Sequence, residues 1–186
     1  MTSWVLIDLL IILIVVVGLI FVVLYNGLVA LRNKVEAAWA QIDVQLTRRS
    51  DLIPNLVETV KGYAAHERET LDAVIQARNM AQSANGPAEA AAADNVLTGA
   101  LKSVFALSEA YPDLKANTNF LALQEELTGT EDKIAYSRQF YNDTVNKYNT
   151  KIQSMPSNII AGMFNFTIRE YFEAAGEARG PVNVQF

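Results

Sequence analysis

The chain has 186 residues, a length typical of a single domain, and 51% of them are hydrophobic. It contains no cysteine, which excludes disulfides, thiolate chemistry and cysteine-ligated zinc. Its formal net charge of −5 excludes the basic surface that nucleic-acid-binding proteins carry, so we expect no nucleic acid as a partner.

Residues 9–31 carry no charged side chain and are dense in Leu, Ile and Val. Because a helix crosses the hydrocarbon core with roughly 20 apolar residues, this segment is predicted to be a transmembrane helix in contact with membrane lipid. Trp4 and Tyr25 lie near its two ends, where amphipathic rings favour the membrane interface. The alternative is a cleaved signal peptide, but such peptides begin with basic residues and have a shorter apolar stretch. The first basic residue here is Arg32.

Basic residues also predict the orientation of this helix. Arg32, Lys34, Arg48 and Arg49 follow the apolar segment, and no Lys or Arg precedes it. The positive-inside rule then predicts that residues 1–8 form a short extracytoplasmic N-terminus and that the rest of the chain lies in the cytoplasm.

The segment that follows the apolar run is predicted to be helical. Apolar residues recur there at spacings of three and four, as on one face of a bundle helix, and they are Leu28, Leu31, Val35, Ala38, Ile42 and Leu46. No proline or glycine occurs between positions 28 and 49, so the transmembrane helix is expected to continue through this segment. Asp51 and Pro54 are predicted to begin a second helix, as its cap and first-turn residue. Asn85, Gly86 and Pro87 end it near residue 84.

A third helix is predicted from about residue 88 to before Pro112, and its expected buried residues are Val96, Leu97, Leu101, Val104, Phe105 and Leu107. A fourth begins at Asn117 or Thr118 and ends at Pro156, with an apolar stripe that steps by four and three. The predicted fold is all-α: an N-terminal transmembrane helix continuous with an elongated antiparallel bundle of about four long helices over residues 28–155. Residues 156–186 form a C-terminal tail, apolar to about residue 176 and extended from Gly180 to Phe186, that folds back on the bundle or docks on a neighbour.

Few residues are suited to catalysis. His66 and Glu67 resemble the start of the zinc-binding motif HExxH, but the fifth position is Thr70, and His66 is the only histidine. No glycine-rich phosphate loop and no GxSxG nucleophile motif occurs. We therefore predict no catalytic residue, no metal and no cofactor, and we expect that the protein is not an enzyme.

Charged residues occur where the stripes of the second and fourth helices predict apolar ones. Because buried charge is costly unless it is paired, we expect Glu67, Arg78, Glu131 and Arg138 to form ion pairs between these helices, or else to reach water from the margin of the stripe. Arg48, Arg49 and Asp51 crowd the expected turn between the first two helices. There they form local salt bridges or contact a neighbouring subunit.

Several motifs between residues 25 and 172 together resemble the LemA family: AW at 38–39, RRSDLIPNLV at 48–57, HE at 66–67, YPDLKAN at 111–117, TEDKIA at 130–135 and YN at 141–142 and 148–149. This resemblance implies a protein of the bacterial inner (cytoplasmic) membrane with an antiparallel helical bundle, and it implies no enzyme. The residues that we take as family-motif and inter-helix contacts are Trp39, Asp43, Arg48, Arg49, Asp51, Pro54, His66, Glu67, Arg78, Tyr111, Glu131, Arg138, Tyr141 and Tyr148.

Two functions fit these features. The first is a non-catalytic membrane scaffold that self-assembles into a homo-oligomer, because a thin bundle cannot hide every large apolar side chain and exposed apolar patches mark interaction surfaces. The candidate oligomer contacts are Tyr63, Phe140, Phe164 and Phe166, unless these rings only cover the tail and fill a single core. The second is an adaptor that tethers a partner protein of unknown identity to the membrane through a groove in the bundle.

Overall fold

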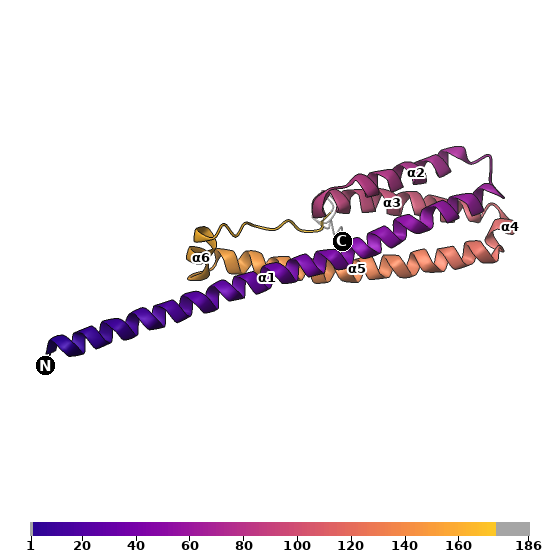
Figure 1. The fold of residues 1–186 in the computed structure, drawn as a ribbon. Coiled ribbons are helices and arrows are strands. Elements are labelled where there is room, and N and C mark those ends of the chain that lie inside the picture. The colour runs from indigo at the N-terminus through magenta and orange to yellow at the C-terminus, as the bar shows by residue number, and fades with distance from the viewer. Residues whose placement is uncertain (1, 174–186) are drawn as a thin grey trace, which may run out of the picture. The chain divides into compact units, whose positions relative to one another are not determined.

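The computed structural model describes residues 2–173, and every regular element in that range is a helix (Figure 1). The order is α1 (Thr2–Lys61), α2 (Arg68–Ser83), α3 (Gly86–Ser108), α4 (Pro112–Lys115), α5 (Thr118–Gln153) and α6 (Ser157–Met163). The predicted all-α class is confirmed. The extended end expected from Gly180 to Phe186 lies outside the described residues.

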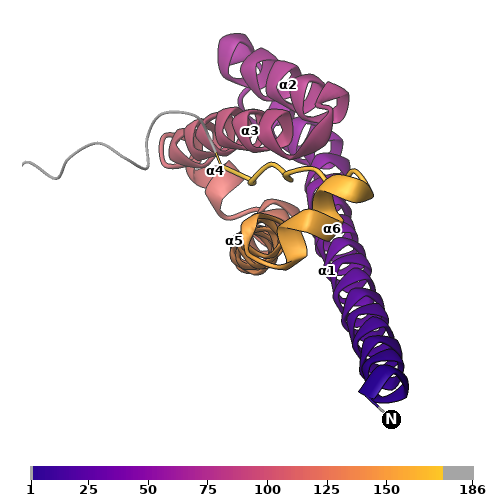
Figure 2. The ribbon, with the colours of Figure 1, turned by 90° about the vertical axis from the view of Figure 1, so that its left-hand side faces the viewer.

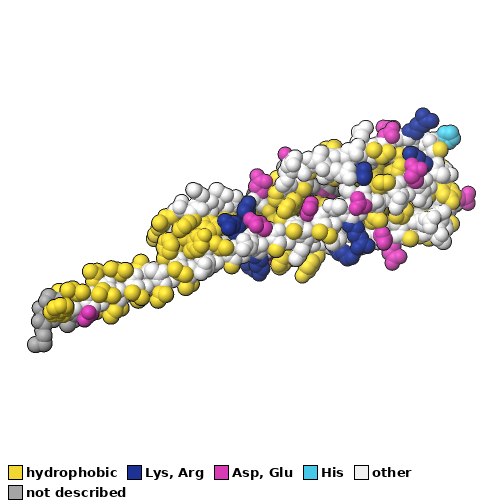
Figure 3. Space-filling model, viewed as in Figure 1, with side chains coloured by type: hydrophobic (Ala, Val, Ile, Leu, Met, Phe, Trp, Pro, Cys, Tyr) yellow, Lys and Arg dark blue, Asp and Glu magenta, His cyan; other side chains and the backbone are white. Residues whose placement is uncertain are grey.

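The first part of α1 is apolar and exposed. Among the residues that the structure describes, α1 is the one helix long and apolar enough to cross a membrane, and none of its most apolar window is buried within the protein. Figure 3 shows these hydrophobic side chains along the N-terminal part of α1. A core helix of a soluble protein would bury such side chains. Length, composition and exposure therefore make residues 9–31 a candidate membrane anchor.

Helix α1 does not end near Arg49, so the prediction that Asp51 and Pro54 begin a new helix is wrong. Pro54 lies inside α1, where its missing N–H leaves the carbonyl of Ser50, four residues earlier, without its helical partner. The Nε–H of Arg78, on α2, donates to this carbonyl over 2.9 Å. Since the side chain of Arg78 replaces the lost bond, the helix continues through the proline to Lys61.

The later helix boundaries follow local capping chemistry. Gly86 opens α3 with a φ of 79°, a left-handed conformation that favours glycine, and Pro87 follows in the first turn. The backbone N–H of Asn85 donates to Glu89 over 2.8 Å. At α5, the side-chain oxygen of Asn117 accepts a 2.9 Å bond from the backbone N–H of Phe120, as an N-cap residue does.

The chain divides into two compact units, each described separately. Unit 2 comprises Trp39–Asn142 and Glu170–Phe186. Within it, α2 and α3 lie side by side and run in opposite directions (Figure 1; Figure 2). Its core contains the buried residues Ile53, Leu56, Val57, Val60, Ala64, Leu71, Val74, Ala77, Leu97, Leu101, Val104, Leu114, Phe120 and Leu127.

Val96 was expected in this core, and that expectation is wrong because its side chain is 47% exposed. The buried stripe of α3 runs through Leu97, Leu101 and Val104. Neighbouring residues on a helix point about 100° apart, so Val96 faces away from the stripe that includes Leu97.

Unit 1 comprises Met1–Ala38 and Asp143–Arg169. Leu28 and Val35 of α1, Tyr148 of α5 and Ile160 of α6 are buried in it. Helix α6 lies beside α1 in both ribbon views (Figure 1; Figure 2). The part of the predicted tail that belongs to this unit, residues 156–169, therefore folds back on the helices, which is one of the two outcomes expected for the tail.

Candidate functional site

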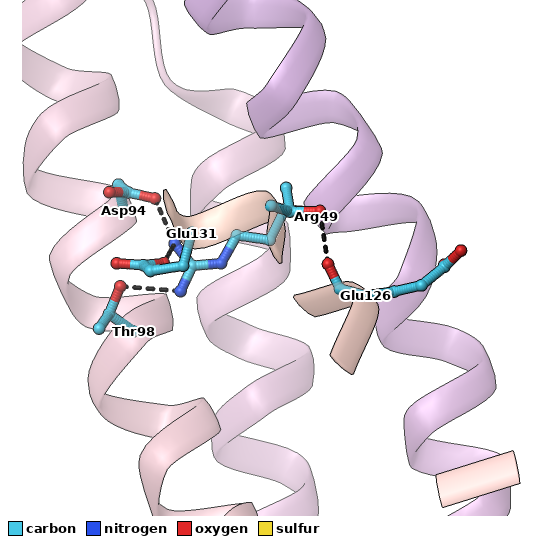
Figure 4. Close-up of polar contacts among 6 residues, drawn as sticks. Arg49, Asp94, Thr98, Glu126 and Glu131 are labelled. Carbon is cyan, nitrogen blue, oxygen red and sulfur yellow. Dashed lines mark hydrogen bonds and ion pairs between the residues drawn. The ribbon is translucent and has the colours of Figure 1, made fainter. Parts of the chain in front are cut away.

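The main polar cluster of unit 2 surrounds Arg49, whose side chain is only 2% exposed. Its Nη1 atom lies 2.5 Å from Oδ1 of Asp94 on α3 and 2.9 Å from Oε2 of Glu131 on α5. Its Nη2 atom donates to the hydroxyl of Thr98 over 2.8 Å. Figure 4 shows the guanidinium directed between these three side chains. One arginine of α1 thus bonds to residues of two other helices.

Burial is the main influence on the ionisation of this cluster. It raises the pKa of the Asp94 carboxyl above its ordinary value of 3.8, while the charge of Arg49 lowers the pKa and only partly offsets the burial. Glu131 adds a second negative charge that raises the same pKa, and the charge of Arg138 lowers it. The guanidinium is directed at carboxylates and a hydroxyl, so the cluster is suited to fixing the register of helices rather than to a reaction.

The charges expected between the second and fourth helices have other partners in the structure. Glu67 accepts a 3.0 Å bond from the hydroxyl of Tyr111, and this bond raises the pKa of Tyr111 above 10.0. Arg78 bonds to the Ser50 carbonyl, and Glu131 bonds to Arg49. Arg138 is exposed on α5. The structure therefore brings Glu131 to α1 and α3, where sequence reasoning placed it opposite the second helix.

Sequence reasoning missed Asp94 and Thr98 as partners of Arg49. Asp94 lies three residues before Leu97 and seven before Leu101, on the buried stripe of α3. A carboxylate at a stripe position was the available signal, and it would have predicted a buried cation on a facing helix. Arg48, the neighbour of Arg49, is exposed and lies 3.7 Å from Glu126.

An aromatic cluster lies elsewhere in unit 2. The ring of Trp39 is 5.7 Å from that of Tyr141 and 6.1 Å from that of Phe172, between ring centroids. The Tyr141 hydroxyl donates to the carbonyl of Glu170 over 2.8 Å. The Asn142 amide donates to the Phe172 carbonyl and accepts from its N–H, over 3.1 and 2.9 Å. These contacts hold residues 170–172 within unit 2.

Unit 1 holds its own extended segment in the same way. The Asn149 amide donates to the carbonyl of Arg169 and accepts from its N–H, each over 2.9 Å. The guanidinium of Arg169 lies 3.1 Å from Glu36. Tyr148 is almost fully buried, and its burial raises the pKa of its phenol. The YN pairs at 141–142 and 148–149 thus each supply a buried ring and an amide that binds backbone.

The four aromatic residues considered as oligomer contacts lie in different surroundings. The Phe164 ring is 4.8 Å from Tyr25 and 5.9 Å from Phe21, and Arg32 lies 5.4 Å from the centre of the Phe166 ring, all within unit 1. In unit 2, the Tyr63 hydroxyl accepts a 2.9 Å bond from Asn117 and its ring is exposed. Phe140 is also exposed.

A groove of about 640 Å³ lies between α1 and α5 on unit 2. Its two large apolar residues, Val44 and Tyr136, are 61% and 73% exposed. We call it the Val44–Tyr136 groove, and its lining consists of Ala40, Gln41, Val44, Gln45, Asp132, Lys133, Tyr136 and Ser137. It therefore combines two exposed apolar side chains with one acidic and one basic side chain.

The remaining predicted residues lie apart from these clusters. Asp43 and Asp51 line a second hollow of about 300 Å³ beside Trp39. His66 is exposed in the turn before α2. Across residues 2–173 the structure contains no group of three His, Cys, Asp or Glu side chains suited to hold a metal ion.

Sequence comparison assigns this arrangement to a family. The sequence model of the LemA family matches residues 38–186, which include the Arg49 cluster, both YN pairs and the Val44–Tyr136 groove. The chain belongs to the LemA family. The resemblance predicted from the motifs is thereby confirmed.

Individual relatives extend this family assignment. The protein named LemA from Metamycoplasma hominis is 28% identical to this LemA-family chain over 154 residues, which cover 81% of the chain and 69% of the relative. Magnetosome protein MamQ 2 from Paramagnetospirillum magneticum is 25% identical over 184 residues, and MamQ from Magnetospirillum gryphiswaldense is 24% identical. Both alignments with MamQ proteins cover 85% of this chain and 68% of the relative.

Proposed function

We propose that this LemA-family protein is a non-catalytic scaffold of the bacterial inner membrane that assembles into a homo-oligomer. Residues 9–31 would anchor it in lipid, and the following helices would form an antiparallel bundle in the cytoplasm. The Val44–Tyr136 groove carries the proposal, because it exposes two large apolar side chains on neighbouring helices.

A second copy of the chain is the occupant that suits this groove. Asp132 and Lys133 both line it and are both exposed. In a two-fold contact the same patch faces itself, so Lys133 of each copy would meet Asp132 of the other. Phe140 lies four residues after Tyr136, on the same helical face, and extends the contact. Anchoring in one membrane also raises the effective concentration of the copies.

The non-catalytic role is part of this proposal, and the printed names of the relatives, Protein LemA and magnetosome protein MamQ, state no reaction. Helical self-assembly through a groove requires no cofactor, no metal and no nucleic acid.

Single cysteines test the self-contact directly, because the natural chain has none to remove. We expect Tyr136→Cys in native membranes to give disulfide-linked dimers on mild oxidation, while Asp72→Cys, on the exposed face of α2, gives none. Lys133→Asp should abolish the crosslink by placing two acids together, and Lys133→Asp combined with Asp132→Lys should restore it. A monomeric mass in lipid nanodiscs, with no crosslink at position 136, would refute self-assembly.

The same cysteine-free background tests the orientation. Asp72→Cys in intact cells should resist a membrane-impermeant maleimide and should react only after the membrane is opened. Labelling in intact cells would place the helices after residue 31 outside the cytoplasm and would overturn the positive-inside argument.

The adaptor function makes a different prediction from the scaffold. If the groove binds another protein, Tyr136→Cys should crosslink to one stoichiometric partner of different mass, and the paired charge exchange at 132 and 133 should not restore that crosslink.

A further inference from the structure

We propose that α6 and the loop after it form a second membrane contact, embedded in the lipid interface beside the transmembrane part of α1. The inference rests on the proposed anchoring of residues 9–31 and adds a lipid-binding element that is distant from them in sequence. Residues 152–168 contain no charged side chain and are flanked by Lys151 and Arg169. A segment of this composition can enter an interface without carrying charge into it.

Helix α6 carries apolar side chains on both its inner and its outer face. Its inner face buries Ser157, Ile160 and Ala161. Its outer face presents Ile159 and Met163, four residues apart, and they are 57% and 64% exposed. In water the exposure of such an apolar face is unfavourable. In the boundary between headgroups and acyl chains it is stabilised.

The contacts of Phe164 place the C-terminal end of α6 next to the candidate anchor. Phe164, directly after α6, packs on Phe21 and Tyr25, which belong to the charge-free segment of α1. At a rise of about 1.5 Å per residue, these two positions lie about 9–15 Å before Leu31 along α1. The Tyr25 position lies within the depth of about 5–10 Å at which interfacial helices lie, and the Phe21 position lies deeper. If residues 9–31 cross the membrane, α6 therefore reaches the same lipid.

Aromatic and basic residues of unit 1 also indicate that α6 lies at the level of the membrane interface. Tyr25, Phe164 and Phe166 form a continuous group of rings, with centroids 4.8 and 6.0 Å apart. Arg32 lies over the Phe166 ring at 5.4 Å. Aromatic rings at the level of the lipid headgroups, with a basic residue on their solvent side, are typical of a membrane interface. Figure 3 shows hydrophobic side chains gathered over both α6 and the N-terminal part of α1.

Depth measurement in the full-length chain tests the inference. Four variants, Leu13→Cys, Ile159→Cys, Met163→Cys and Val96→Cys, are each labelled with the fluorophore NBD and reconstituted in phosphatidylethanolamine–phosphatidylglycerol vesicles. Lipids that carry a nitroxide quencher near the headgroup or deep in the acyl chain then report the position of each label. Val96 is a matched control because it is an exposed apolar residue of unit 2.

We expect shallow quenchers to remove the emission of labels at 159 and 163, deep quenchers to remove that at 13, and neither to affect 96. Quenching at 13 without quenching at 159 and 163 would overturn the second contact and leave the anchor intact. Equal quenching at 96, 159 and 163 would overturn it as well. No quenching at 13 would remove the anchor, and the proposed function and this inference would both fail.

Discussion

Arg78 on α2 donates its Nε–H to the backbone carbonyl of Ser50 on α1, which is the carbonyl that Pro54 leaves without a helical N–H. A tertiary contact therefore repairs a defect in secondary structure. The sequence separates the two residues by 28 positions.

The repair predicts a coupling between positions 54 and 78. Arg78→Ala should lower the free energy of unfolding by about 1–3 kcal/mol, because a largely buried carbonyl loses its donor. In a Pro54→Ala background the new N–H at position 54 bonds to Ser50 instead, so the same substitution should cost less. Denaturant unfolding of the four variants in detergent gives the double-mutant cycle. Equal costs in both backgrounds would mean that the contact does not replace the missing bond.

Adjacent arginines on α1 should differ sharply in their effect on stability. Arg49→Met leaves Asp94 buried without its cation and should cost about 3–5 kcal/mol of unfolding free energy. Arg48→Met removes an exposed pair with Glu126 at 3.7 Å and should cost at most about 1 kcal/mol. Urea unfolding of both variants makes the comparison. Similar losses would contradict the buried role of Arg49.

The raised pKa of Asp94 predicts a pH dependence of stability. Because the folded protein binds this proton more tightly than the unfolded chain, the contribution of Asp94 is fully present below pH 3.8 and decreases as pH rises through its folded pKa. Asp94→Asn removes this pH-dependent contribution to the free energy of unfolding. The difference in unfolding free energy between the natural chain and Asp94→Asn should therefore decrease from pH 3.8 upward. A difference that grows with pH in this window would show that Arg49 outweighs burial.

The bond between Tyr111 and Glu67 predicts a spectroscopic shift. Glu67→Ala removes the acceptor and the charge that favour the protonated phenol, so the pKa of Tyr111 should fall toward 10.0. Phenolate absorbance measured with and without Tyr111→Phe isolates this residue from the other tyrosines. Glu69→Ala, which changes an exposed acid in the first turn of α2, should leave the titration unchanged. An unaltered pKa in Glu67→Ala would exclude the contact in solution.

Asn149 should protect the chain at Arg169 from trypsin. Its amide makes two bonds to the backbone of Arg169. Asn149→Ala removes both bonds, at about 0.5–1.5 kcal/mol each, and should speed cleavage after Arg169 at least fivefold. Thr150→Ala, at the next and exposed position, should leave the cleavage rate as it is. Equal rates in the two variants would contradict this role of the amide.

Local patterns predicted the helices well. The spacing of three and four on α1 correctly marks Leu28, Val35 and Ile42 as buried, and Asn117 is the cap that its residue type suggests. Such signals are local, since they depend on neighbours within a turn. They failed at Pro54, because the donor that rescues the helix there comes from another helix.

The partners of Arg49 in the polar cluster could not be predicted from local patterns, because they also lie on other helices. The sequence pattern placed Arg49 in the turn between the first two helices, because that turn was predicted just before Pro54. Once α1 continues, Arg49 faces the interior, and its partners come from α3 and α5. Which carboxylate meets which guanidinium depends on how helices pack, and periodicity alone does not determine that register.

The amides of Asn142 and Asn149 bind only the N–H and C=O that every residue except proline possesses. These hydrogen bonds therefore do not depend on the side chains of Phe172 and Arg169. These bonds therefore place no constraint on the side chains of the tail residues that they hold. Aspartate cannot replace either asparagine, because a carboxylate cannot donate a hydrogen bond to the backbone carbonyl. The specificity of these contacts therefore resides in the two asparagine amides and not in the side chains of the segment that they hold.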